Sequence, residues 1–147
     1  NAHYYSPEVM NEQASALGDA CAKAIEESGK KVVLISSHSL SHRHFVTESP
    51  LPEDMSREHI YNHSQYVWDM KLVDLMRDGK MKEVIDIMPE FTEQTIAETE
   101  AGGLTWMMAA MGYPEYPAEI YGYQSVIGTG NLIAAWDPIE ATREIVL

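Results

Sequence analysis

The stretch "VVLISSHSLSHRHF", residues 32–45, decides the fold class that we predict for this chain. Its first part, 32–37, begins with four consecutive apolar side chains and shows no alternation of apolar and polar residues. Such a run favours a short strand that is buried on both faces. A helix is predicted directly before it, and a helix followed by a buried strand is typical of an α/β sheet. We therefore predict an α/β fold.

The predicted helix has clear start and stop signals. Ser6 can cap its first turn, Pro7 fits the first helical position, and Gly29 can end it. Between these signals, apolar or small residues recur at helical spacing: Met10, Ala14, Leu17, Cys21, Ala24 and Ile25. Cys21 is the only cysteine and cannot form an internal disulfide, so we interpret it as an inert thiol on the buried side of the helix.

The rest of the chain is predicted to form several helices, followed by a final pair of strands. A polar, proline-rich surface excursion is expected at 49–63. Four helical segments follow, at about 68–79, 81–88, 89–99 and 104–112. Pro89 is expected to separate the second from the third, since proline lacks the backbone N–H that a helix interior needs. Two strands, 118–128 and 131–137, are then expected to join through a tight connection at Thr129-Gly130.

Composition narrows the classes of partner. The 147 residues fit one domain, and a formal charge of −13 argues against nucleic acid or an anionic membrane as a partner. No apolar run approaches the roughly 20 residues needed to cross a bilayer. Because nothing in the cysteine content requires an oxidising compartment, a cytoplasmic location is expected.

Three histidines, His38, His42 and His44, follow the predicted strand within seven positions. Ligand sites of α/β proteins gather in loops beyond the carboxyl ends of strands. Histidine both transfers protons near neutral pH and binds transition metals. From spacing alone, the cluster is compatible with a metal site, a proton-transfer site or a solvated polar loop. The other three histidines lie in polar segments, and we interpret them as surface residues or as structural hydrogen-bonding residues: His3, His59 and His63.

Glu98 is the carboxylate that periodicity singles out. If residues 90–99 are helical, one face of the helix holds four residues: Phe91, Gln94, Thr95 and Glu98. Glu93 and Glu100 would point the opposite way. A carboxylate carried inward in line with Phe91 needs a cation or a metal to offset its desolvation. The pattern therefore makes Glu98 a candidate functional residue, with ordinary surface charge as the other interpretation.

Four motifs together resemble one enzyme family. They are "SLSHRHF" (39–45), "PEDMSREH" (52–59), "YVWDMKLVDLMRDGKMKEV" (66–84) and "TWMMAAMGYPEYPAEIYGYQSVIGTGN" (105–131). In this order they resemble the catalytic subunits of the type III extradiol ring-cleaving dioxygenases. The resemblance covers nearly the whole chain, but only the C-terminal half of the family's polypeptide. Residues 1–147 are therefore expected to form the C-terminal half of a single extradiol dioxygenase catalytic domain.

The resemblance implies a fold, a metal and a reaction. The fold would be a mixed β-sheet flanked by helices on both faces. Such enzymes hold Fe(II) with two histidines and one glutamate and leave positions open for an aromatic substrate and O2. Glu98 matches the glutamate ligand, and His42 matches the histidine that serves as acid and base without binding the metal. The implied reaction opens the ring of 2-aminophenol, or of a substituted relative, to a 2-aminomuconate semialdehyde.

The family's two histidine ligands belong to the N-terminal half, and no segment of this sequence matches them. The simpler interpretation is that a missing N-terminal half carries both histidines and that residues 1–147 alone are inactive. An iron site built from His38, His44 and Glu98 is the other interpretation. The family's α2β2 arrangement also implies a related α subunit as partner.

Three alternatives stay open from the sequence. One is cleavage of a catechol such as protocatechuate by the same chemistry. Another is a non-catalytic subunit of such an enzyme, although retention of His42 and Glu98 argues against it. The last is a histidine-rich loop that binds adventitious zinc.

Overall fold

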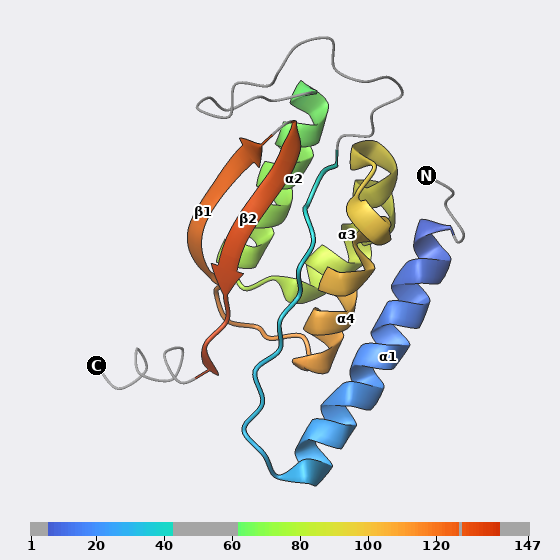
Figure 1. Cartoon of the computed structure of the whole chain (residues 1–147), viewed down its shortest axis with the longest axis vertical. Helices are drawn as coiled ribbons and strands as arrows, with labels where there is room; N and C mark the ends of the chain where they lie inside the picture. The colour runs from blue at the N-terminus through green and yellow to red at the C-terminus, as the bar shows by residue number, and fades with distance from the viewer. Residues whose placement is uncertain (1–5, 43–61, 127, 139–147) are drawn as a thin grey trace.

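Helices and one small sheet make up the part of the chain that the computed structural model describes, residues 6–42, 62–126 and 128–138. The elements are α1 (Pro7–Ser28), α2 (His63–Arg77), α3 (Met81–Thr95), the short 3-10 turn η1 (Glu98–Ala101), α4 (Gly102–Ala110), β1 (Glu119–Val126) and β2 (Thr129–Ala135). The two strands form an antiparallel sheet. Figure 1 shows the hairpin on one side of the molecule, α1 on the other, and the extended chain after α1 running between them. The combination of helices with a sheet agrees with the predicted α/β class.

Helix α1 begins and ends where the sequence predicts. The Ser6 hydroxyl accepts a hydrogen bond from the Val9 N–H at 3.3 Å, and Gly29 ends the helix with a left-handed φ of 61°. Fewer residues of α1 are buried than the helical spacing predicted, because α1 packs mainly against one helix, α4. Leu17 remains 60% exposed, and Cys21 is only partly buried, with its sulfur accepting from the Trp106 indole N–H.

Gly18 lets α1 and α4 approach each other closely. A Cβ at this position would overlap the Ala109 Cβ and the Trp106 carbonyl oxygen. Gly18→Ala is therefore expected to reduce the free energy of unfolding by about 1–3 kcal/mol, as overpacking of a close interface does. Chemical denaturation of the complete protein measures this change. Gly122→Ala is the control, because no atom lies within 4 Å of a Cβ added there; equal stability of the two variants would contradict close α1–α4 packing.

The core lies between α2, α3 and α4. Its largest fully buried side chains include Leu72, Met76, Met81, Val84, Met88, Phe91 and Met108. The predicted break at Pro89 is wrong, since α3 continues through it to Thr95. Proline costs a helix interior about 3 kcal/mol. Complete burial of Met88 and Phe91 on the same helix offsets that cost, because tertiary packing supplies most helical stability in proteins.

The predicted hairpin is confirmed, with a shifted turn. Ser125 pairs with Gly130 and Val126 with Thr129, so the predicted connecting residues Thr129 and Gly130 belong to β2. The chain reverses two positions earlier, where Gly128 adopts a φ of 72° that suits a glycine. The register shifts between Ile120 and Gly122.

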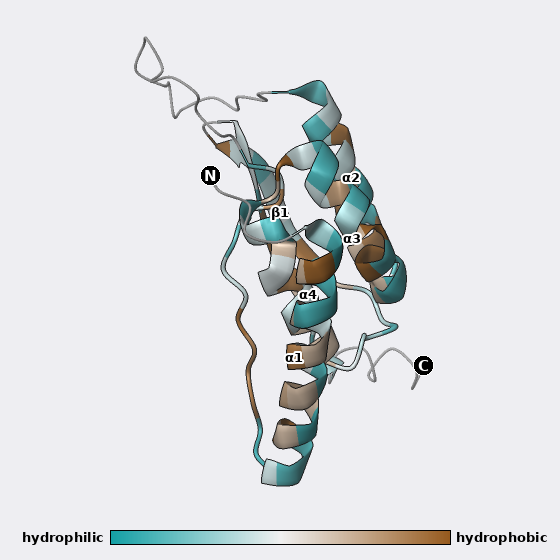
Figure 2. Ribbon diagram, turned by 90° about the vertical axis from the view of Figure 1, so that its right-hand side faces the viewer, coloured by the Kyte–Doolittle hydropathy of each residue, from teal (hydrophilic) through white to brown (hydrophobic). Residues whose placement is uncertain are grey.

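The predicted buried strand at 32–37 is not a strand in this structure. The segment is extended, and its backbone makes no hydrogen bond to another described residue. Val33 is 85% and Ile35 78% exposed, whereas Leu34 packs against the core. Figure 2 shows the apolar part of this segment at the edge of the molecule. The expected mixed sheet with helices on both faces is therefore absent from the described residues, because no strand pairs with this segment there.

Among the described helices, none combines the length and apolar character of a membrane-crossing segment.

A candidate metal and proton-transfer site

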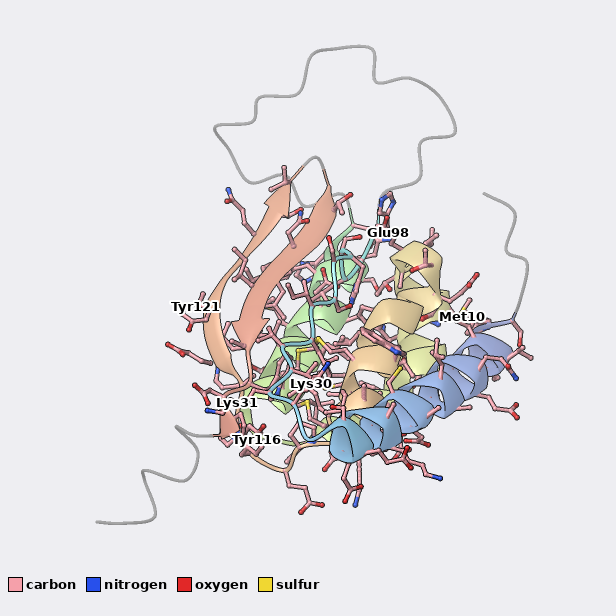
Figure 3. All side chains as sticks on the ribbon, turned by 60° about the horizontal axis from the view of Figure 1, so that its bottom comes forward. Met10, Lys30, Lys31, Glu98, Tyr116 and Tyr121 are labelled. Atoms are coloured by element: carbon pink, nitrogen blue, oxygen red, sulfur yellow. The ribbon has the colours of Figure 1, made fainter. Side chains whose placement is uncertain are left out.

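The candidate site forms where the extended chain after α1 reaches the C-terminal end of α3. Helix α3 ends at Thr95, and Ile96 turns the chain with a left-handed φ of 53°. Glu98 follows two residues later at the start of η1. Figure 3 shows Glu98 at the end of the molecule away from Lys30, Lys31 and Tyr116. The turn at Ile96, rather than a helical face, thus places the Glu98 side chain.

Ser39 holds the Glu98 carboxylate. The Ser39 N–H donates to Glu98 Oε2 at 3.1 Å, and the Ser39 hydroxyl donates to the same oxygen at 3.2 Å. The backbone hydrogen bond is the main cause that lowers the pKa of Glu98, and the hydroxyl and the nearby His42 and His38 lower it further against the opposing effect of desolvation. The carboxylate is therefore ionised at neutral pH, with Oε1 accepting no hydrogen bond from another described residue.

His42 is attached to the same helix end. Its backbone N–H donates to the Thr95 carbonyl at 3.3 Å, and the Gln65 side-chain amide donates to that carbonyl at 2.9 Å. The last carbonyls of a helix have no partner within the helix and need one from outside. The end of α3 therefore fixes His42 through Thr95 and positions Glu98 three residues further along. His42 also contributes electrostatically to the lowered pKa of Glu98.

His38 is the second imidazole near Glu98. Its Nδ1 lies 2.6 Å from the Ser39 carbonyl oxygen. When Nδ1 carries the proton and donates to that oxygen, Nε2 is the nitrogen that remains as an acceptor or metal ligand. His44 lies outside the described residues, so the alternative set of His38, His44 and Glu98 stays a prediction.

The backbone around Glu98 is strained. Thr99, Glu100 and Ala101 have φ values of 49°, 47° and 54°, in the left-handed region that non-glycine residues avoid. Each such residue costs roughly 1–2 kcal/mol. Backbone strain of this kind clusters at binding and catalytic sites, where the surrounding fold maintains it. Burial of Ala101 and of the adjoining helix α4 maintains it here.

Of the described side chains, Glu98 has the chemistry of a metal ligand. Glu98 combines an ionised carboxylate with an oxygen available for coordination, which suits one ligand of a divalent metal. Among residues 6–42, 62–126 and 128–138, no group of three histidine, cysteine or carboxylate side chains is arranged to hold a metal ion.

The predicted orientation of the acidic residues needs correction. Because α3 ends at Thr95, Gln94 is exposed and Glu98 is only partly buried, whereas Glu100, predicted to face away, is 7% exposed. Asp69 was missed by the sequence argument although it is fully buried. A signal existed for Asp69: it precedes Leu72, Val73 and Met76 at helical spacing and so lies on the apolar face of α2.

Comparison with known proteins identifies the family. Residues 2–134 match the family described as the catalytic LigB subunit of aromatic ring-opening dioxygenase. The chain is 47% identical over 139 residues to the 2-aminophenol 1,6-dioxygenase beta subunit of a Pseudomonas species, covering 95% of this chain and 46% of the relative. It is 28% identical over 105 residues to the 3,4-dihydroxyphenylacetate 2,3-dioxygenase of Escherichia coli, covering 71% and 37%.

The chain thus spans less than half the length of each of these relatives. The family match, in contrast, extends over nearly all of it. Both relatives are named as dioxygenases, in agreement with the family description. This chain belongs to the family of catalytic LigB subunits of aromatic ring-opening dioxygenases.

Proposed function

We propose that the complete protein is a non-haem Fe(II) extradiol dioxygenase that opens the ring of 2-aminophenol, or of a substituted 2-aminophenol, with O2. The expected product is a 2-aminomuconate semialdehyde. Family membership supports ring opening, and the 47% identical relative named for 2-aminophenol supports this class of substrate.

One observation of the structure carries the proposal. Ser39 binds the Glu98 carboxylate, and three residues later His42 binds the end of the helix that leads to Glu98. The same short segment, 39–42, thus binds the ionised Glu98 carboxylate through Ser39 and attaches His42 to the end of α3. A carboxylate ligand beside an imidazole suits a metal centre with a separate proton-transfer group.

The two side chains have different roles in this proposal. Glu98 binds the metal through its carboxylate, with Oε2 oriented by the Ser39 donors. The imidazole of His42 takes the proton from the ring hydroxyl of the substrate and later returns a proton as the ring opens. Fe(II) held there would bring the aromatic substrate and O2 together.

The remaining ligands are proposed to come from two histidines outside this chain, in an N-terminal half of the complete protein. This chain aligns with only 46% and 37% of the length of the two relatives, which supports a longer complete protein. The exposed apolar side chains of 32–37, and a backbone without partners among the described residues, suit a strand of a larger mixed sheet with helices on both faces. The intact mass of the protein purified from its source tests this: a mass near that of residues 1–147 would contradict it.

A related α subunit is the proposed partner, in an α2β2 assembly. The 47% identical relative is named a beta subunit, which supports a second type of subunit. A cytoplasmic location is proposed with it, since the single Cys21 needs no oxidising compartment.

Cleavage of a catechol is the second candidate, because the Escherichia coli relative is named for a dihydroxylated aromatic acid. Oxygen uptake by the complete, iron-loaded protein separates the two candidates. We expect kcat/KM to be at least about tenfold higher with 2-aminophenol than with catechol or protocatechuate, a difference of about 1.4 kcal/mol in transition-state binding. The reverse order would replace the 2-aminophenol assignment with the catechol one.

A non-catalytic subunit and a zinc-binding loop are tested by the same preparation. Elemental analysis is expected to find iron in proportion to the complete protein. Absence of iron together with absence of oxygen uptake would favour the non-catalytic subunit, and zinc in its place would favour the loop.

A further inference from the structure

Asp69 is a buried carboxylate that the proposed reaction does not use. It lies on α2 and is 0% exposed, beside the apolar residues Leu72, Val73 and Met76. Burial raises the pKa of Asp69, and hydrogen bonds from Ser41 and Tyr123 oppose that rise. A buried carboxylate is costly unless donors satisfy it, so its partners indicate what it is for.

Three donors converge on this carboxylate. The Ser41 N–H donates to Asp69 Oδ1 at 2.9 Å, and the Ser41 hydroxyl donates to Oδ2 at 2.6 Å. The Tyr123 hydroxyl on β1 donates to Oδ2, also at 2.6 Å. Asp69 therefore binds both the main chain and the side chain of the residue directly before His42, and ties them to α2 and β1.

The main chain of β2 fixes the same residue from the other side. The Leu40 N–H donates to the Gly130 carbonyl at 2.8 Å, and the Gly130 N–H donates to the Ser41 carbonyl at 3.0 Å. A Cβ at Gly130 would overlap the Asp69 carboxylate and lie 2.8 Å from both the Ser41 and Tyr123 hydroxyl oxygens. Glycine at 130 thus provides the space in which Asp69, Ser41 and Tyr123 meet.

The geometry points to Asp69 as a positioning residue that fixes Ser41 and, through it, the imidazole of His42 relative to Glu98. The inference rests on the proposed function, since the role of His42 belongs to it. An apolar side chain of similar volume would pack against the core beside α2 without the desolvation cost of a carboxylate. The two carboxylate oxygens of Asp69 accept separately from the N–H and the hydroxyl of Ser41, which restrains the residue before His42 at two points.

Asp69→Ala in the complete, iron-loaded protein tests the inference. We expect kcat per bound iron to fall by about 10²-fold, the loss typical of a displacement near 1 Å at a reacting group. KM and the iron content are expected to stay within about twofold, because neither substrate binding nor the metal depends on Asp69. Asp69→Asn should recover part of the loss, since its amide oxygen can still accept from the Ser41 N–H.

A double mutant separates action through His42 from a general effect. If Asp69 acts through His42, Asp69→Ala added to His42→Ala should cause no further loss of kcat. A full additional loss in the double mutant would overturn the inference. So would an unchanged kcat per bound iron in Asp69→Ala with only the melting temperature lowered, because that pattern belongs to a purely structural carboxylate.

Two further measurements keep the test independent of folding and of the proposed reaction. If Asp69→Ala does not fold, Ser41→Ala removes one of the donors and should lower kcat per bound iron severalfold. Tyr123→Phe should do the same, and the control Tyr121→Phe should not, because Tyr121 is exposed and binds Glu119.

If the complete protein opens no aromatic ring, the proposed function fails. Amide hydrogen exchange of residues 39–42 then decides the positioning: faster exchange in Asp69→Asn supports it, and unchanged exchange overturns it.

Discussion

Replacing His42 by alanine in the complete protein is expected to lower the turnover number by about 10²–10⁴ while iron stays bound. Removal of a positioned general acid and base costs a rate factor of this size. The variant leaves the Glu98 carboxylate and its Ser39 donors in place, since His42 contacts Thr95 through its backbone N–H. Steady-state oxygen uptake measures the turnover number, and metal analysis of the same sample measures the iron.

His63→Ala is the matched control, because His63 is exposed at the start of α2 and its ring stacks on Tyr66. Its turnover is expected to equal that of the unmodified protein. Loss of iron in His42→Ala would show that His42 is a metal ligand, and the proton-transfer role assigned to it would then be wrong.

Replacing Glu98 by alanine is expected to deplete the complete protein of iron and to abolish ring opening. Loss of a residue that merely orients a metal ligand already weakens metal binding by about 10–100-fold, so loss of a direct ligand should exceed this. The ionised state of Glu98, maintained by the Ser39 donors, supports its role as the anionic ligand. Iron per protein after dialysis, measured by elemental analysis, gives the result.

Glu93→Ala provides the comparison, since Glu93 is an exposed carboxylate on α3 only five positions away. It should retain the iron and the activity of the unmodified protein. Normal iron content in Glu98→Ala would exclude Glu98 as the carboxylate ligand and direct attention to Glu100, the buried acid of the same segment.

Local signals in the sequence predicted α1, α4 and the hairpin, but they divided α3 wrongly at Pro89. Residues that are close in the sequence determine these features, such as the caps of α1 at Ser6 and Gly29 and the apolar run of α4. The strand predicted at 32–37 does not form among the described residues, because an apolar run shows only that a segment can be buried. Whether it is buried depends on a pairing strand, which the described residues do not provide.

The candidate site also combines features that the sequence predicted with features that it did not. Glu98 was selected for a shared helical face that does not exist, because α3 ends at Thr95 and Ile96 redirects the chain. Periodicity cannot predict such a turn, since the left-handed φ of a non-glycine residue is imposed by packing. The family resemblance selected Glu98 independently of helical periodicity, and the roles of Glu98 and His42 stay predictions.

The sequence by itself determined the family, the helix boundaries of α1 and the presence of His42 in a loop rich in serine and histidine, because these depend on residue identity and on short spacings. Only the tertiary structure decided that Ser39 binds Glu98 and that Asp69 binds Ser41, across 59 and 28 positions of the chain. Hydrogen bonds between such distant residues exist only after the core of α2, α3 and α4 has packed, and no local pattern records them.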